Sequence, residues 1–241
     1  MAPYISDNLN LSGNSHEAYL KAPDFQNFKH PPRVLVIGAG SRGTAYAEAA
    51  LQGTNAIIAA VCEPIYSKRE AFCKRFIWTG KRPAQPGQQF LDWQQWIEYE
   101  EERREDAARG QMVGPGIDAV FVCVLDEMHE EVVCGIAPLG VHICCEKPLS
   151  TRLDSCIKMY KALEDAKKIN VAEEGKKESI FGICHVLRYS PHNMLLRHLV
   201  RDKNVIGDIL SIEHCEPVGH WHFSHSYVRY SALLSITVTV N

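Results

Sequence analysis

The sequence predicts an α/β protein built on a doubly wound parallel sheet. Apolar runs of about four to eight residues alternate along the chain with segments whose apolar residues recur at helical spacing. Strands that are apolar throughout are typical of parallel sheets, because helices cover both faces. The 241 residues are 46% hydrophobic and 23% charged, which is ordinary for a globular protein of one or two domains.

The expected elements follow one another from residue 33. The apolar runs predict strands at residues 34–38, 56–63, 117–125, 141–146 and 179–186. Helices are expected at residues 41–51 and 65–76, from Phe90 onward, around 132–137, and from Thr151 through Leu163. Gly140 has the position of a C-terminal helix cap. The charge run at residues 98–106 is interpreted as a solvated helix face that leads into a surface loop.

The character of the sequence changes after residue 186. A helix with proline in its first turn is followed by rough alternation at Ile209–Cys215, which predicts a strand. We therefore expect an N-terminal tail at 1–32, the doubly wound domain at 33–186, a partial α+β domain at 187–229, and a divergent tail at 230–241. The partial domain is too short for a core of its own.

Composition excludes several classes of partner. The net charge is −3, with 26 basic and 29 acidic residues, so we expect neither a nucleic-acid partner nor a membrane surface. The start of the chain has no basic region followed by an apolar one, as a secretory signal would, and no run approaches the roughly 18 apolar residues of a membrane span. A cytoplasmic protein is expected.

The nine cysteines include no C-x-x-C pair, and several lie in apolar runs, among them Cys62, Cys123, Cys144, Cys145 and Cys184. This pattern favours buried free thiols in a reducing compartment. A zinc site or a catalytic thiol is the alternative.

The first strand runs into a G-x-G-x-x-G motif, Gly38, Gly40 and Gly43, that opens the next helix. In this context the glycines allow a tight turn, close approach of the backbone to a pyrophosphate, and close helix–strand packing. The helix N-terminus, with Ser41 and Arg42, supplies N–H groups and partial positive charge to phosphates. The motif predicts a Rossmann NAD(P)-binding domain.

Glu63 ends the second strand, where a ribose-binding carboxylate belongs. A carboxylate there accepts hydrogen bonds from the ribose hydroxyls and repels a 2′-phosphate, which favours NAD. The basic residues Arg42, Lys68 and Arg69 nearby leave NADP possible. The alternative is a glycine-rich turn beside an ordinary exposed glutamate.

Four motifs in this order resemble the Gfo/Idh/MocA (glucose–fructose oxidoreductase/inositol dehydrogenase) family. They are GAGSRG, CEP at 62–64, VLDEMHEEVV in place of the family's threonine–proline–asparagine loop, and CEKPLS at 145–150. The later GICHVLRYSPHN and EPVGHWHFSHSYVR resemble the start of the second domain in a fungal-type branch. The resemblance covers roughly residues 33–229.

The resemblance implies hydride transfer between a sugar-like or polyol carbon and the nicotinamide. By position, Lys147 corresponds to the family's catalytic lysine, Glu146 to its partner, and Pro148 to the proline of a bend commonly made through a cis peptide. An ammonium near a developing alkoxide stabilises it, which suits Lys147 to this role. The alternative is an exposed lysine before a turn proline.

The resemblance also places Leu125, Asp126 and His129 beside the nicotinamide ribose. The family's proline and asparagine are absent from this loop, and the alternative is an N-cap aspartate followed by a surface histidine.

Substrate contacts are expected farther along the chain. The candidates are His185, Arg188, Tyr189, His220 and Trp221, and packed sheet residues are the equal alternative. A metal site among His214, His220, His222 and His225 lacks a supporting carboxylate or cysteine pattern, so no metal is expected.

The sequence departs from the family in two ways. The family's Asp–His pair, spaced four apart, occurs nowhere, and the residues after Arg229 do not resemble the corresponding part of the family. We therefore expect a C-terminally shortened product, and a non-catalytic dinucleotide-binding protein is the alternative to the enzyme. The resemblance implies that full-length relatives pair through the sheet of the second domain, most of which this chain lacks.

Overall fold

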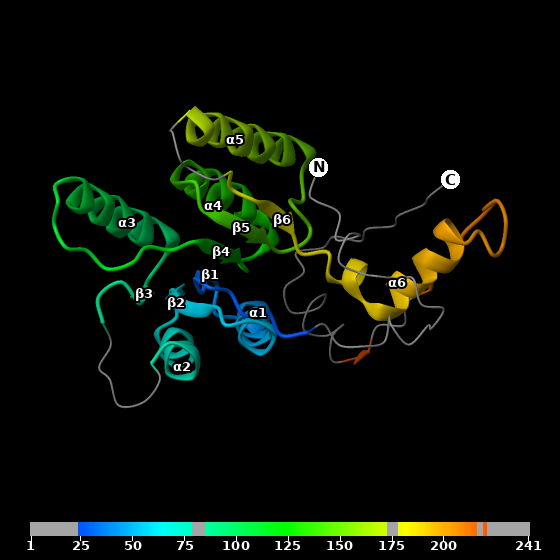
Figure 1. Cartoon of the computed structure of the whole chain (residues 1–241), viewed down its shortest axis with the longest axis horizontal. Coiled ribbons are helices and arrows are strands. Elements are labelled where there is room, and N and C mark those ends of the chain that lie inside the picture. The colour runs from blue at the N-terminus through cyan, green and yellow to red at the C-terminus, as the bar shows by residue number, and fades with distance from the viewer. Residues whose placement is uncertain (1–23, 79–84, 173–177, 216–218, 221–241) are drawn as a thin grey trace. The chain divides into compact units, whose positions relative to one another are not determined.

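A computed structural model describes residues 24–78, 85–172, 178–215 and 219–220 (Figure 1). The chain divides into two compact units, Met1–Met194 and Leu195–Asn241.

The first unit is built on one parallel sheet of six strands in the order β3-β2-β1-β4-β5-β6. The strands are β1 (Arg33–Ile37), β2 (Ile57–Cys62), β3 (Gln89–Phe90), β4 (Ala119–Val122), β5 (His142–Cys145) and β6 (Phe181–Ile183). Every neighbouring pair runs parallel. The doubly wound parallel sheet predicted from the apolar runs is therefore confirmed.

Helices connect the strands, as the alternation predicts. They are α1 (Ser41–Gly53), α2 (Tyr66–Phe76), α3 (Trp93–Ala108), η2 (Asp126–Met128), α4 (His129–Ile136), η3 (Ala137–Leu139), α5 (Leu153–Ala172), η4 (Val186–Tyr189), α6 (Pro191–Arg197) and η5 (His198–Asp202). Gly140 follows η3 in the left-handed conformation, with φ of 67°, so the predicted cap is confirmed. Among the described residues no helix has the length and apolarity to cross a membrane.

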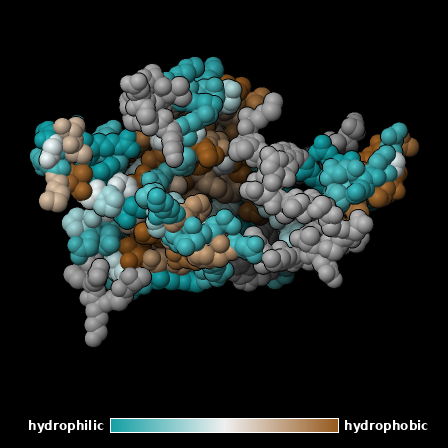
Figure 2. All heavy atoms as spheres, in the orientation of Figure 1, coloured by the Kyte–Doolittle hydropathy of each residue, from teal (hydrophilic) through white to brown (hydrophobic). Residues whose placement is uncertain are grey.

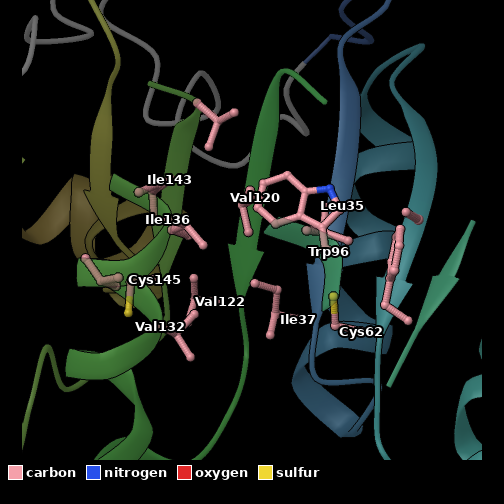
Figure 3. Packing of buried hydrophobic residues seen from close by; sticks show 14 of the residues in the cluster. Leu35, Ile37, Cys62, Trp96, Val120, Val122, Val132, Ile136, Ile143 and Cys145 are labelled. Carbon is pink, nitrogen blue, oxygen red and sulfur yellow. The ribbon is translucent and has the colours of Figure 1, made fainter. Parts of the chain in front are cut away.

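The sheet separates two apolar cores, and Figure 3 shows residues of one of them. On one face, Leu35, Val120 and Ile143 pack with Trp96 of α3, Val132 of α4 and Met159 of α5. On the other face, residues of β1 and β2 pack against Ala47 of α1 and Phe72 of α2. Figure 1 shows α1 and α2 on one side of the sheet and α4 and α5 on the other, while Figure 2 shows hydrophilic residues over much of the visible surface.

Helix α3 begins later than its apolar spacing predicts. Phe90 lies in β3, where it pairs with Cys62, and the helix starts at Trp93. The carboxylate of Asp92 caps the helix, because its Oδ1 accepts the N–H of Gln95 at 2.8 Å. The predicted start at Phe90 is wrong, since the cap residue decides where the helix begins.

The charge run of α3 is not wholly solvated, which corrects its interpretation. Glu100 is 2% exposed and lies four residues after the buried Trp96, on the same side of the helix. Its Oε1 and Oε2 each accept a hydrogen bond from Arg103 at 2.7 Å, and Oε1 also accepts one from Arg104 at 2.7 Å. The buried negative charge of Glu100 is therefore paired with two guanidinium groups.

The strand predicted at Ile209–Cys215 is also wrong. These residues have no regular secondary structure, and Leu210 is 95% exposed. A strand needs a neighbour whose backbone pairs with it, and the described part of the second unit provides none. The α+β character of residues 187–229 therefore stays a prediction.

Candidate functional site

The loop after β1 lies at the carboxyl edge of the sheet, where the strand order reverses between β1 and β4. Gly38 has φ of +97° and donates its N–H to the carbonyl of Cys62 at 2.8 Å. A Cβ on Gly38 would overlap the carbonyl oxygen of Cys123. The turn after β1, which lies between the ends of β2 and β4, therefore needs glycine at this position.

The two other glycines of the motif have different surroundings. A Cβ on Gly43 would overlap the carbonyl oxygen of Gly38 and lie 2.9 Å from Cγ1 of Val36, so Gly43 brings α1 close to β1. A Cβ on Gly40 would meet no described atom within 4 Å. The backbone at Gly40 therefore borders open space, as the approach of a diphosphate requires.

The N-terminus of α1 lies beside this open space. Gly40 is the N-cap residue and supplies no side-chain bond to the first turn. The N–H groups of Ser41, Arg42 and Gly43 have no acceptor within the helix, because the first turn has no preceding carbonyl groups. Ser41 and Arg42 are exposed. Together these donors and the helix dipole suit a bound anion.

Glu63 is fixed against the glycine loop. Its Oε2 accepts the N–H of Ala39 at 2.9 Å, and its Oε1 accepts the N–H of Ile65 at 3.0 Å. The residue is 6% exposed, so the alternative of an ordinary exposed glutamate is wrong. Each carboxylate oxygen has a second lone pair, which leaves acceptor capacity for a ribose.

Glu146 directly follows β5 and is buried. Its Oε1 accepts the hydroxyl of Tyr46 from α1, and its Oε2 accepts the N–H of Lys147 at 3.1 Å. Burial of the Tyr46 hydroxyl, followed by its bond to Glu146, raises the pKa of Tyr46 far above its usual range. The tyrosine therefore keeps its proton and donates a hydrogen bond to the carboxylate.

Lys147 is exposed at the end of β5, and the peptide bond between it and Pro148 is cis, as the resemblance implies. The carbonyl of Pro148 lies 2.9 Å from Nδ1 of His129, so Nδ1 carries the proton and donates. His129 is 0% exposed, and its Nε2 has no hydrogen-bond partner among the described residues. The alternative of a surface histidine is wrong.

The segment before α4 also does not have the expected N-cap aspartate. Asp126 is the first residue of η2, whereas the N-cap residues of η2 and α4 are Leu125 and Met128. The interpretation of Asp126 as a cap is therefore wrong. Leu125 and Asp126 are both exposed, and their place beside a nicotinamide ribose stays a prediction.

The predicted substrate residues divide into two sets. His185, Arg188 and Tyr189 are exposed and follow β6, the strand next to β5, at the same edge of the sheet as Lys147. His220 is exposed in the second unit, whereas Trp221, His222 and His225 lie outside the described residues. Within the described ranges, no group of three or more His, Cys, Asp and Glu residues is placed to hold a metal ion.

Sequence reasoning missed Tyr46 as a member of the site. It lies three residues after Gly43, on the side of α1 that faces the sheet, where its ring packs edge-on against Phe121 with centroids 6.0 Å apart. A half-buried tyrosine needs a partner for its hydroxyl. That need was the available signal, and only the fold identifies Glu146 as the partner.

A family model described as an oxidoreductase family with an NAD-binding Rossmann fold, GFO_IDH_MocA, matches residues 32–174, which is more than half of the chain. The chain belongs to this family. The Gfo/Idh/MocA resemblance of the four motifs is thereby confirmed at the level of the family and of its NAD-binding Rossmann fold.

Two of the similar proteins are named for a sugar derivative and for a polyol. The chain is 37% identical over 96 residues to the 1,5-anhydro-D-fructose reductase of Ensifer adhaerens, a match that covers 39% of this chain and 26% of that protein. It is 40% identical over 57 residues to the myo-inositol 2-dehydrogenase of Thermotoga maritima, which covers 24% of this chain and 16% of that one.

Solved structures share the fold. The scyllo-inositol dehydrogenase of Lactobacillus casei with bound NAD(H) and scyllo-inositol matches with a TM-score of 0.57 and 16% identity, over 75% of this chain and 43% of that chain. A levoglucosan dehydrogenase in complex with NADH and levoglucosan matches with a TM-score of 0.54 and 22% identity, over 77% and 41%. The chain thus spans about two fifths of these relatives.

Proposed function

We propose that this chain binds NAD(H) at the carboxyl edge of its sheet and transfers a hydride between the nicotinamide and a sugar-like or polyol substrate. One observation carries the proposal. The open space at Gly40 is bordered by the uncapped N-terminus of α1 and by Glu63, whose carboxylate is bonded to the N–H of Ala39 in the same loop.

The residues present fit the dinucleotide. The N–H groups at the start of α1, with Ser41 and Arg42, would hold the diphosphate, and the carboxylate of Glu63 would accept the ribose hydroxyls. The negative charge of Glu63 favours NAD(H) over NADP(H), because it repels a 2′-phosphate. Leu125 and Asp126 follow β4, and His129 is the first residue of α4; we place the nicotinamide ribose beside this segment.

Lys147 is proposed as the catalytic lysine. The nicotinamide, when bound, accepts or donates the hydride. Lys147 would donate a hydrogen bond to the substrate oxygen and stabilise its developing negative charge, or accept its proton. Glu146 fixes the backbone of Lys147 through its N–H, while His129 holds the next residue through the carbonyl of Pro148. The substrate would lie toward His185, Arg188 and Tyr189.

The test separates binding from turnover. Purified protein is titrated with NADH and NADPH by nucleotide fluorescence and is then assayed against a panel of polyols, aldoses and anhydrosugars. The proposal expects NADH to bind more tightly than NADPH, and NAD⁺ to be reduced with at least one polyol. Lys147→Met should lower kcat by a factor of 100 or more and leave NADH affinity within about twofold, because Lys147 acts on the substrate. Lys161→Met, an exposed lysine on α5, is the matched control and should change neither quantity.

A second candidate function is dinucleotide binding without turnover. It is favoured by the sequence, in which no aspartate is followed four residues later by a histidine. Tight NADH binding with no turnover on the whole panel would select this function over the enzyme. Absence of binding to either nucleotide would reject both.

A further inference from the structure

Two thiols meet at the edge of the sheet beside Glu146. Sγ of Cys144, in β5, lies 3.1 Å from Sγ of Cys184, which directly follows β6. Both cysteines are free in this structure. The S–S distance of a disulfide is about 2.05 Å, so an approach of roughly 1 Å separates the two thiols from a covalent bond.

The register of β5 and β6 explains why the thiols meet. Cys144 pairs with Gly182, so Cys144, Gly182 and Cys184 lie on one face of the sheet, while Cys145 faces the opposite core. Gly182 has no side chain, and a Cβ there would meet no described atom within 4 Å. Gly182 therefore places no side chain between Cys144 and Cys184.

We propose that Cys144 and Cys184 form a dithiol site that a peroxide oxidises to a disulfide. Neither cysteine is among the proposed dinucleotide or substrate contacts, although both lie at the same edge of the sheet, and the bond adds a covalent modification to the chain. Neither sulfur needs to leave its strand for the bond to form, because the two backbones are already joined by the N–H of Cys184 and the carbonyl of Cys145 at 2.8 Å.

The surroundings make Cys184 the thiol that reacts first. The hydrogen bond with Cys144 is the largest cause that lowers the pKa of Cys184 to about 7, and burial opposes the shift. The same bond, together with burial, raises the pKa of Cys144. Cys184 is 9% exposed and Cys144 is half-buried, so a molecule as small as hydrogen peroxide is the fitting oxidant.

The reaction has two balanced steps. The Cys184 thiolate attacks one oxygen of hydrogen peroxide, which forms an S–O bond, breaks the O–O bond and releases hydroxide that takes a proton to become water. The sulfur of Cys144 then attacks the sulfur of the Cys184 sulfenic acid, which forms the S–S bond and breaks the S–O bond, and the thiol proton of Cys144 joins the departing hydroxide as a second water. The two sulfurs together lose two electrons, and the peroxide gains them.

The test uses the full chain with Cys215→Ser, because Cys215 is exposed and would react on its own. The reduced protein is treated with hydrogen peroxide at pH 7, and its thiols are then counted after denaturation. The proposal expects a loss of two thiols per chain that dithiothreitol restores. Digestion with trypsin and a glutamate-specific protease should yield one cross-linked pair of peptides, and fragmentation should place the bond between Cys144 and Cys184.

Single substitutions supply the controls. Cys144→Ser and Cys184→Ser should each abolish the disulfide, whereas Cys134→Ser and Cys156→Ser, half-buried cysteines on other elements, should leave it unchanged. Survival of the two-thiol loss in Cys144→Ser would overturn the proposal, as would no loss at all or a bond from Cys184 to Cys123. If a serine variant does not fold, the peptide map of the Cys215→Ser protein decides alone. The readout is a covalent bond, so it does not depend on whether the chain binds a nucleotide.

Discussion

At the residue scale, Glu63 joins two parts of the candidate site. Its carboxylate bonds the N–H of Ala39 in the glycine loop and the N–H of Ile65 after β2, which fixes both oxygens near the open space at Gly40. The sequence predicted the position of this residue from its place at the end of a strand. It did not predict the burial, because the bonds to backbone N–H groups depend on how the two loops fold together.

Replacement of Glu63 should discriminate between the two nucleotides. Glu63→Ala removes an acceptor of ribose hydroxyls and should weaken NADH binding about 10- to 100-fold, while NADPH binding changes less because a repulsive charge is also lost. Fluorescence titration with each nucleotide measures both constants. Glu101→Ala, on the exposed surface of α3, should change neither. Equal losses for NADH and NADPH would contradict the role of Glu63 as the ribose ligand.

Substitutions of the two glycines at the start of α1 should affect stability and nucleotide binding differently. Gly43→Ala places a methyl group against the carbonyl of Gly38 and should cost roughly 3 kcal/mol of unfolding free energy. Gly40→Ala meets no described atom and should cost less than about 1 kcal/mol, yet it should weaken NADH binding at least tenfold because the methyl group enters the space of the diphosphate. Urea unfolding and NADH titration give the two quantities. A Gly40→Ala protein with full affinity would show that the loop does not contact the nucleotide.

At the element scale, α3 shows where sequence patterns mislead. A charge run predicts a solvated face, but helical spacing from Trp96 turns Glu100 toward the interior, where Arg103 and Arg104 pair with it. Arg103 also donates to the carbonyl of Gly114 at 3.2 Å, which ties the helix to the loop before β4. Burial alone would raise the pKa of Glu100, but the bonds to both arginines outweigh it and hold the pKa below its usual value.

This ion pair predicts a pH-dependent stability. Glu100→Gln should cost about 3 kcal/mol at pH 7, because it leaves paired guanidinium groups without a charge partner. The folded pKa is lowered, so the contribution is fully present above the ordinary glutamate pKa of about 4.3 and is lost as the pH falls through the folded value. Urea unfolding should therefore show the difference between wild type and Glu100→Gln shrinking below about pH 4.

A matched control lies on the same helix. Glu105 pairs with Arg109 at 2.9 Å, but both side chains are largely exposed. Glu105→Gln should cost less than about 1 kcal/mol and show little change with pH. If the difference in unfolding free energy between wild type and Glu100→Gln stays constant from pH 7 to pH 3, Glu100 does not contribute as a buried charge.

At the scale of the whole molecule, apolar periodicity predicted most of the first unit. The continuous apolar runs of β1 and β2 are buried on both faces almost throughout, so the sequence alone indicates that helices cover both sides of these strands. Contacts between distant elements were beyond that pattern. The bond from Tyr46 to Glu146 and the bond from His129 to Pro148 join residues far apart in sequence, and the alternation at Ile209–Cys215 gives no strand without a partner.

The carboxyl edge of the sheet unites these observations. The glycine loop, Glu63, Glu146 and Lys147 all follow strands that end there, as expected for a ligand site at a reversal of strand order. Calorimetric titration of the purified chain with NADH tests this claim most directly. We predict saturable binding with one site per chain. The affinity for NADH should be at least tenfold lower in Gly40→Ala. No heat of binding with either NADH or NADPH, from a protein that unfolds cooperatively, would contradict the account.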